Sequence, residues 1–488
     1  RCCTPHPCTV LLPLLGPAHS VLRLYLCSHP LLMLLRRAVL SVALCCVAIC
    51  GGFVNGFDLY SGPLARSMAL SPTFTSLCAS ASVAGTFFLL PAGTLYDKYG
   101  PVKLAIGASS VAASSFIGLS FVPDSTGPGA RVLILLLLLL VSFGSGAAFC
   151  AAFSAALSIA TADAANDERK SSKYLPAVVS GSMGLSVMFC SSVIALVEST
   201  AGDQCDAAQA NYSGDSVCWR AVVRTLGFML LGIQVPGALA MLAYRRRDYA
   251  QLQSTDTLPP VERPLLPDPT DRPQLLRRTT DRRMTLRDVS SYVASDPAFF
   301  VLCWAYMAAI GSPIWFLTSA SSILDDFLRG EDSPWLKLIL PVWSGCNAAG
   351  NIVIGGALAA LKVRFGVRYQ AVLAVTSLLL AGDFVLLAVL RAHDAAFSSL
   401  IVFLLLLTGT CFGVFVLLFP TVISEVYGDR NFGKFYGFVQ IAATVGGTVF
   451  PVIGSRFHSA EHGYLYMYIF CSVCLAIGGA GMWWRVKR

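Results

Sequence analysis

The chain has 488 residues, of which 56% are hydrophobic and only 13% are charged, and its mean hydropathy is +0.68. Because a soluble globular chain carries about 25% charged residues, this composition excludes an ordinary water-soluble fold. The net charge of +8 lies in loops without a basic stripe of interleaved aromatic residues, so we expect a lipid bilayer and no nucleic acid as partner.

Residues 1–37 form an apolar leader interrupted by prolines, which we expect to be disordered or to lie at the membrane interface. Twelve apolar runs follow, each near the roughly 20 residues that a helix needs to cross a bilayer. Barrel strands are only about 10 residues long, so the sequence predicts an all-α membrane protein with 12 transmembrane helices. The runs are 38–60, 74–95, 102–122, 131–159, 175–197, 220–243, 298–322, 335–361, 368–390, 398–424, 433–456 and 464–484.

The stretch 245–297 separates these runs into two groups of six and is rich in proline and arginine. It is interpreted as a cytoplasmic linker, mostly without regular structure. Within it, Thr285-Leu-Arg-Asp288 predicts the capped start of a short helix before the seventh span. The expected domains are an N-terminal six-helix bundle at 38–244 and a C-terminal six-helix bundle with a short tail at 298–488.

The positive charges indicate the orientation of the helices, because cytoplasmic loops collect lysine and arginine. Of the 35 lysines and arginines, 25 fall on one set of loops and 8 on the other. Both termini are therefore expected in the cytoplasm, in the plasma membrane or an endomembrane.

The opposite loop 198–219 contains the sequon at Asn211 together with Cys205 and Cys218. It predicts a glycosylation site and a disulfide. The remaining cysteines show no metal-ligand spacing, and neither a metal nor a cofactor is expected.

Polar side chains recur along one face of several spans. Asn55 lies on such a stripe in span 1, Asn347 and Asn351 in span 8, Gln440 in span 11 and Trp315 in span 7. Polar groups within a membrane usually face the bundle interior, so these five residues are interpreted as candidates for a substrate cavity. The alternative is that the amides bond across helices and that Trp315 packs in the core.

Asp58 lies about 30 Å along span 1 from Ala38, in its outer third. Two interpretations remain for it: a proton-coupling carboxylate, or an interfacial acid exposed to water. No span holds a lysine, an arginine or a histidine near its midpoint. Because strongly anionic solutes need a cationic anchor, a neutral or zwitterionic substrate is favoured.

The loop Gly93-Thr-Leu-Tyr-Asp97-Lys-Tyr-Gly100-Pro-Val-Lys103 closely resembles the signature loop of the major facilitator superfamily, between spans 2 and 3. The resemblance covers about residues 38–485 and implies two six-helix bundles and secondary transport by alternating access. Segments 51–60, 296–300 and 424–433 are similar to the nodulin-like and monocarboxylate-porter-like branch. That branch uses a lysine in span 1 and an acid–arginine pair in span 8, where this chain has Asp58 and its two asparagines.

By this resemblance, the signature loop is a conformational latch formed by Gly93, Asp97, Gly100 and Lys103. Asp97 is expected to face the N-terminus of span 11 near Phe432, and Glu425 and Arg430 belong to the same cytoplasmic gate. Ninth spans of the family are peripheral, so Asp383 is interpreted as forming a structural hydrogen bond.

The leading hypothesis is a secondary transporter for a small polar organic solute, amino acid-like or another small metabolite, with facilitated diffusion and proton coupling both open. The alternatives are a sensor that has kept the fold without transport and a monocarboxylate transporter. An enzyme is not expected, because the sequence shows no nucleotide loop, histidine cluster or paired carboxylates.

Overall fold

The computed structural model describes residues 30–123, 127–165, 174–209, 219–241, 284–328, 335–393, 398–428, 431–458 and 464–487, and these are almost entirely helical with no strand among them. Eleven of the helices in the described part are long and apolar enough to cross a membrane. The bent pair α8 and α9, at 40°, would be the twelfth. The predicted set of twelve spans is confirmed, each within a few residues of its expected limits.

The N-terminal helices are α2 (Pro30–Gly51), η1 (Phe53–Gly56), α3 (Phe57–Ser67), α4 (Pro72–Phe87), α5 (Leu90–Tyr99), α6 (Pro101–Leu119), α7 (Pro128–Ala165), α8 (Leu175–Gly184), α9 (Ser186–Gln209), α10 (Trp219–Met229) and η3 (Leu230–Gln234). The C-terminal helices are α13 (Leu286–Ser295), α14 (Pro297–Leu328), α15 (Trp335–Ala349), η6 (Gly350–Ile354), α16 (Gly355–Phe365), α17 (Tyr369–Ala392), α18 (Ser398–Tyr427), α19 (Phe432–His458) and α20 (Leu465–Lys487).

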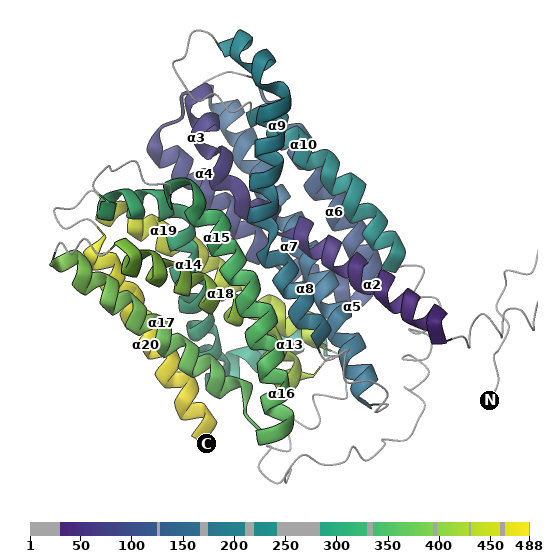
Figure 1. Ribbon diagram of the computed structural model, residues 1–488. Helices are drawn as coiled ribbons and strands as arrows, with labels where there is room; N and C mark the ends of the chain where they lie inside the picture. Colours follow the sequence, from purple (N-terminus) through teal and green to yellow (C-terminus); the bar gives the residue numbers. More distant parts are fainter. Residues whose placement is uncertain are drawn as a thin grey trace, which may run out of the picture.

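The helices pack as two groups, one from each half of the chain (Figure 1). In the first group, α7 packs on α2, α4, α6 and α8. In the second, α14 packs on α19 and α20, and α17 packs on α18 and α20. The groups meet where α19 lies against α4 and α5, and where α15 lies against α8 and α9. The central site therefore lies between two bundles.

The two halves share a turn of the same shape. Gly100 follows α5 with φ of 78°, and Gly366 follows α16 with φ of 65°. A positive φ is strained for residues with a side chain, so glycine is required at both turns. The turns occupy equivalent places, after the second span of each half.

Two observations concern the predicted leader and linker. Helix α2 begins at Pro30, inside the stretch 1–37, while residues 1–29 and 242–283 lie outside the described part of the chain. The short helix in the linker is confirmed as α13. The Thr285 side chain accepts a hydrogen bond from the Asp288 backbone, and the Asp288 side chain accepts one from the Thr285 backbone, forming a capping box.

Asp383 is buried in α17 with only 4% of its surface exposed. Neither of its carboxyl oxygens has a hydrogen-bond partner among the described residues. The expected structural hydrogen bond is therefore wrong for the part of the chain that the structure describes.

We predict that Asp383→Leu raises the unfolding temperature of the purified protein. Burying a polar group without a partner costs about 1–3 kcal/mol in proteins, and leucine has a similar volume without that cost. Thermal unfolding in detergent measures the change, with Ser377→Ala on the same buried face as the control. A lower unfolding temperature for Asp383→Leu would show that the carboxyl has a stabilising partner.

Candidate functional site: a central cavity and a latch between the bundles

A narrow cavity of about 20 Å³ lies between the two bundles. Its polar lining residues are Asn55 and Thr86 from the first half, and Tyr306, Tyr436 and Gln440 from the second. Leu89, Phe149, Met183, Phe412 and Val416 complete it. A water molecule needs roughly 10–15 Å³ of such space, so in this conformation the cavity has room for about one water molecule and not for an organic solute.

Asn55 reaches the cavity because the first span is broken. The α-helix ends at Gly51, and the one-turn 3-10 helix η1 contains Asn55. A Cβ atom at Gly52 would overlap the Ser186 side chain of α9, so the glycine permits the close approach of the two helices at the break. The break turns an amide toward the space between the bundles.

The best-defined polar contact in the cavity joins Gln440 and Tyr306. Gln440 Nε2 donates to the Tyr306 hydroxyl at 3.1 Å, and Tyr436, one turn before Gln440, interacts with the same hydroxyl. Gln440 is 1% exposed, yet its Oε1 has no hydrogen-bond partner among the described residues. This acceptor is available for a donor on a solute, because an unpaired buried oxygen is costly.

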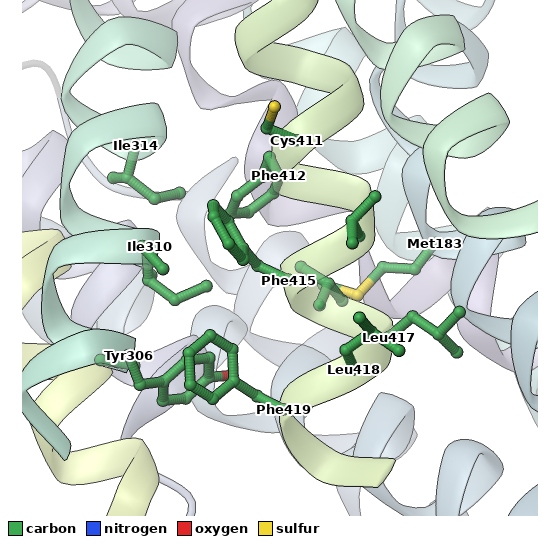
Figure 2. Packing of buried hydrophobic residues seen from close by; sticks show 14 of the residues in the cluster. Met183, Tyr306, Ile310, Ile314, Cys411, Phe412, Phe415, Leu417, Leu418 and Phe419 are labelled. Carbon is green, nitrogen blue, oxygen red and sulfur yellow. The ribbon is translucent and has the colours of Figure 1, made fainter. Parts of the chain in front are cut away.

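An apolar wall lies beside this polar group. Phe412 of α18 and Met183 of α8 both line the cavity, and the Tyr306 ring packs on Phe419 with centroids 4.3 Å apart. Figure 2 shows Ile310 and Ile314 of α14 facing the same side of α18. The cavity thus combines uncharged hydrogen-bonding groups with aromatic and aliphatic surface, and no charged side chain lines it.

A second narrow cavity extends the site along spans 1, 2 and 7. Asn55 lines both cavities, and Val54, Phe57, Ser82, Leu317 and Thr318 are among the other lining residues of the second. The shared asparagine therefore marks the junction of the two spaces.

The signature loop meets the start of α19. Asp97 Oδ2 and Lys434 Nζ form an ion pair at 2.6 Å, with side chains only 9% and 14% exposed. A Cβ atom at Gly93 would overlap the carbonyl of Gly433, so the backbones of α5 and α19 are in direct contact. An acid placed at the first turn of a helix is also stabilised by the helix dipole.

We call this end of the bundles the latch end. The structure brings Gly93, Asp97 and Gly100 together there, while Lys103 is exposed and lies 5.9 Å from the Tyr99 ring centroid. Glu425 is half-buried near the end of α18, and Arg430 lies outside the described residues. A second contact closes the same end, since a Cβ at Gly355 of α16 would lie 3.1 Å from the Ala177 Cβ of α8.

The structure places three of the proposed cavity residues elsewhere. Ser180 Oγ of α8 donates to Asn351 Oδ1 at 2.5 Å, and Asn351 Nδ2 donates to the carbonyl of Asn347 at 3.0 Å. This network joins the two bundles instead of lining the cavity. Ser344 extends it, donating to the carbonyl of Gly184 and accepting from the Met188 backbone.

Trp315 packs within the second bundle, away from the cavity. Its ring lies 5.6 to 6.1 Å from those of Tyr468, Tyr464 and Phe384. Asp58 lies in the first turn of α3, but its side chain is outside what the structure describes, as is that of Cys205. Asn211 and Cys218 also lie outside the described residues, so the glycosylation site and the disulfide stay predictions.

Sequence reasoning missed Lys434, Tyr306 and Tyr436 as site residues. Lys434 was counted only among the 25 basic residues on one set of loops, although it lies three residues after Asn431, which precedes α19. Tyr436 is one helical turn before Gln440 and therefore lies on the same face of span 11. Tyr306 lies nine residues before Trp315, the residue of span 7 that was named as a cavity candidate.

No family model matches the chain. It is 24% identical over 448 residues to a probable transporter, MCH1, of Eremothecium gossypii. The matched segment covers 91% of this chain and 86% of that protein. It is also 24% identical over 198 residues to the probable transporter MCH1 of Saccharomyces cerevisiae, 40% of each chain.

Solved structures share the fold. The proton:xylose symporter XylE is 14% identical with a TM-score of 0.60, covering 92% of this chain and 96% of that one. The transporter FucP in its outward conformation is 15% identical with a TM-score of 0.58, covering 91% and 98%. The chain therefore has the fold of the major facilitator superfamily, and its place in the nodulin-like branch stays a prediction.

Proposed function

We propose that this chain, whose fold is that of the major facilitator superfamily, is a secondary transporter that moves a small, neutral or zwitterionic polar solute by alternating access. The observation that carries the proposal is the central cavity, which both bundles line with uncharged amides and hydroxyls. In this fold, solutes bind between the two halves, which then rock about the site.

The state of the two ends supports alternating access. The latch end is closed by the contact of α5 with α19 and by the approach of α16 to α8. The second cavity leads from Asn55 along spans 1, 2 and 7, away from that end. A solute would enter by this second route, and opening of the latch would release it on the other side.

The lining narrows the class of substrate. Amide and phenol groups can donate to and accept from hydroxyls, amides or a zwitterion, and aromatic rings can stack on an apolar face of the solute. A free monocarboxylate finds no cation among the lining residues, so the monocarboxylate alternative is disfavoured. Two similar structures belong to symporters named for xylose and fucose, and a polyhydroxylated solute fits the same groups.

The test is uptake into proteoliposomes against a panel of sugars, amino acids, monocarboxylates and vitamins. We expect saturable uptake of a neutral or zwitterionic member and none of a simple monocarboxylate. Val449→Ala, a change on the exposed face of α19, is the control and should transport normally. Absence of flux for every member would favour the sensor that keeps the fold without transport.

Proton coupling gives a separate prediction at Asp58. If this carboxylate binds the coupled proton, wild-type uptake rises when the entry side is acidified, and Asp58→Asn abolishes that rise because asparagine cannot exchange a proton. Uptake measured across imposed pH gradients checks it. Uptake and pH dependence equal to those of the wild type would assign Asp58 to the interface.

A further inference from the structure

Helix α13 is a short segment of the linker that lies on the membrane bundle. It spans only Leu286–Ser295 and begins with the capping box at Thr285. Isolated helices shorter than about 12–15 residues are marginal in water, so α13 depends on its docking for stability. Its folded state can therefore respond to whatever happens in the linker.

One face of α13 is buried against the C-terminal bundle. Val289 is completely buried, and Tyr292, three residues later, follows it on the same face. The Tyr292 ring meets Tyr427 of α18 and Phe435 of α19 edge-on, with centroids 6.1 and 5.7 Å apart. The Tyr427 and Phe435 rings stack on each other at 4.4 Å, so α13 contacts both helices that flank the turn before α19.

A polar contact fixes the same turn. Asn431, the residue immediately before α19, is fully buried, and its Oδ1 accepts a hydrogen bond from the Met284 backbone at 2.9 Å. At the end of the preceding helix α18, Tyr427 donates its hydroxyl to Asp296 Oδ2 at 3.4 Å. The start of α13 and the residue after its end are thus both tied to the α18–α19 connection.

The first turn of α19 is held from two sides. Gly433 and Lys434 face α5 of the other bundle, where Lys434 pairs with Asp97. Phe435, the next residue, faces Tyr292 of α13. Because the same turn contacts both α5 and α13, a movement of the turn away from α5 would also alter its contacts with α13.

We propose that α13 is a clamp that holds the first turn of α19 in position to form the latch, so that the linker controls the opening of the latch end. The proposal rests on the alternating-access function proposed above. A partner or modification that pulls α13 from the bundle would weaken the latch without touching the cavity.

The test is the distance across the latch end in Tyr292→Ala, compared with Ser291→Ala on the exposed face of α13. Spin labels are placed by unnatural amino acids at Val39 of α2 and Phe365 of α16, because the 17 cysteines of the chain interfere with thiol labelling. We expect Tyr292→Ala to raise the ratio of long to short distances about tenfold, and Ser291→Ala to match the wild type.

A second variant, which perturbs the packing less than Tyr292→Ala, keeps the proposal testable if Tyr292→Ala does not fold. Thr285→Ala removes the N-cap, so it should free α13 partly and shift the distances in the same direction by a smaller factor. Amide hydrogen exchange of residues 286–295 reports the release of α13 directly. Release of α13 with unchanged distances in both variants would overturn the clamp.

The double variant Asp97→Asn/Tyr292→Ala and its two single variants distinguish failure of the proposed clamp from failure of the alternating-access function on which the clamp rests. Asp97→Asn and Tyr292→Ala act on the same turn, so their combination should add little to Asp97→Asn alone, whereas full additivity would contradict the clamp. If Asp97→Asn shifts the distances and Tyr292→Ala does not, the clamp alone fails. If neither shifts them, alternating access through this latch fails as well. No substrate is needed for these readings.

Discussion

Asp97→Asn should open the latch end and slow transport. The substitution keeps the shape of the side chain but removes its charge, leaving the Lys434 ammonium, 14% exposed, without its carboxylate. Losing a hydrogen bond between charged groups costs roughly 1.5–3 kcal/mol, and about 1.4 kcal/mol already changes the ratio of two states tenfold. We expect the closed state of the latch end to lose at least that factor, with a several-fold fall in uptake velocity.

The measurement combines uptake velocity with the interspin distance across the latch end. Lys98→Gln is the matched control, because Lys98 is the exposed neighbour of Asp97 and lies over the Tyr99 ring instead of at α19. Lys434→Gln should reproduce the effect of Asp97→Asn, since each variant removes one charge of the same pair. A wild-type distance distribution in Asp97→Asn would show that the ion pair does not stabilise the closed state.

The spans could be predicted because the bilayer imposes a length and a composition on each of them. A run of about 20 apolar residues has few alternatives to a helix in lipid. The start of α13 could also be predicted, because a capping box involves residues only three apart. The break at Phe53–Gly56 was not predicted. The Gly51-Gly52 pair was the signal, since adjacent glycines weaken a helix.

Contacts between distant segments could not be derived from local patterns. Lys434 is separated from Asp97 by 337 residues. Only the family resemblance placed Asp97 at the N-terminus of span 11, and no local pattern indicated Lys434 as its partner. The Asn347 and Asn351 stripe was recognised correctly as facing the interior, but an amide stripe does not reveal whether its partner is a solute or another helix. Ser180 is that partner for Asn351, as the alternative of bonding across helices allows.

Gln440→Met should weaken substrate binding about five- to tenfold. Methionine preserves the length and volume of the side chain but removes the Nε2 donor to Tyr306 and the unpaired Oε1 acceptor. A hydrogen bond contributes about 0.5–1.5 kcal/mol net, and the Tyr306 hydroxyl keeps only its contact with Tyr436. The other amide of the cavity, Asn55, belongs to the opposite bundle, so we expect it to replace the lost contact only in part.

The concentration dependence of uptake distinguishes a cavity role for Gln440 from a packing role. A group that binds the solute equally in ground and transition states raises KM and leaves the maximal velocity nearly unchanged. Thr444→Val is the matched control one turn along α19, because the Thr444 hydroxyl donates only to the Gln440 carbonyl of its own helix. A normal KM with a reduced amount of folded protein in Gln440→Met would assign Gln440 to helix packing, and the substrate site would then have to lie at Asn55 and Thr86 across the cavity.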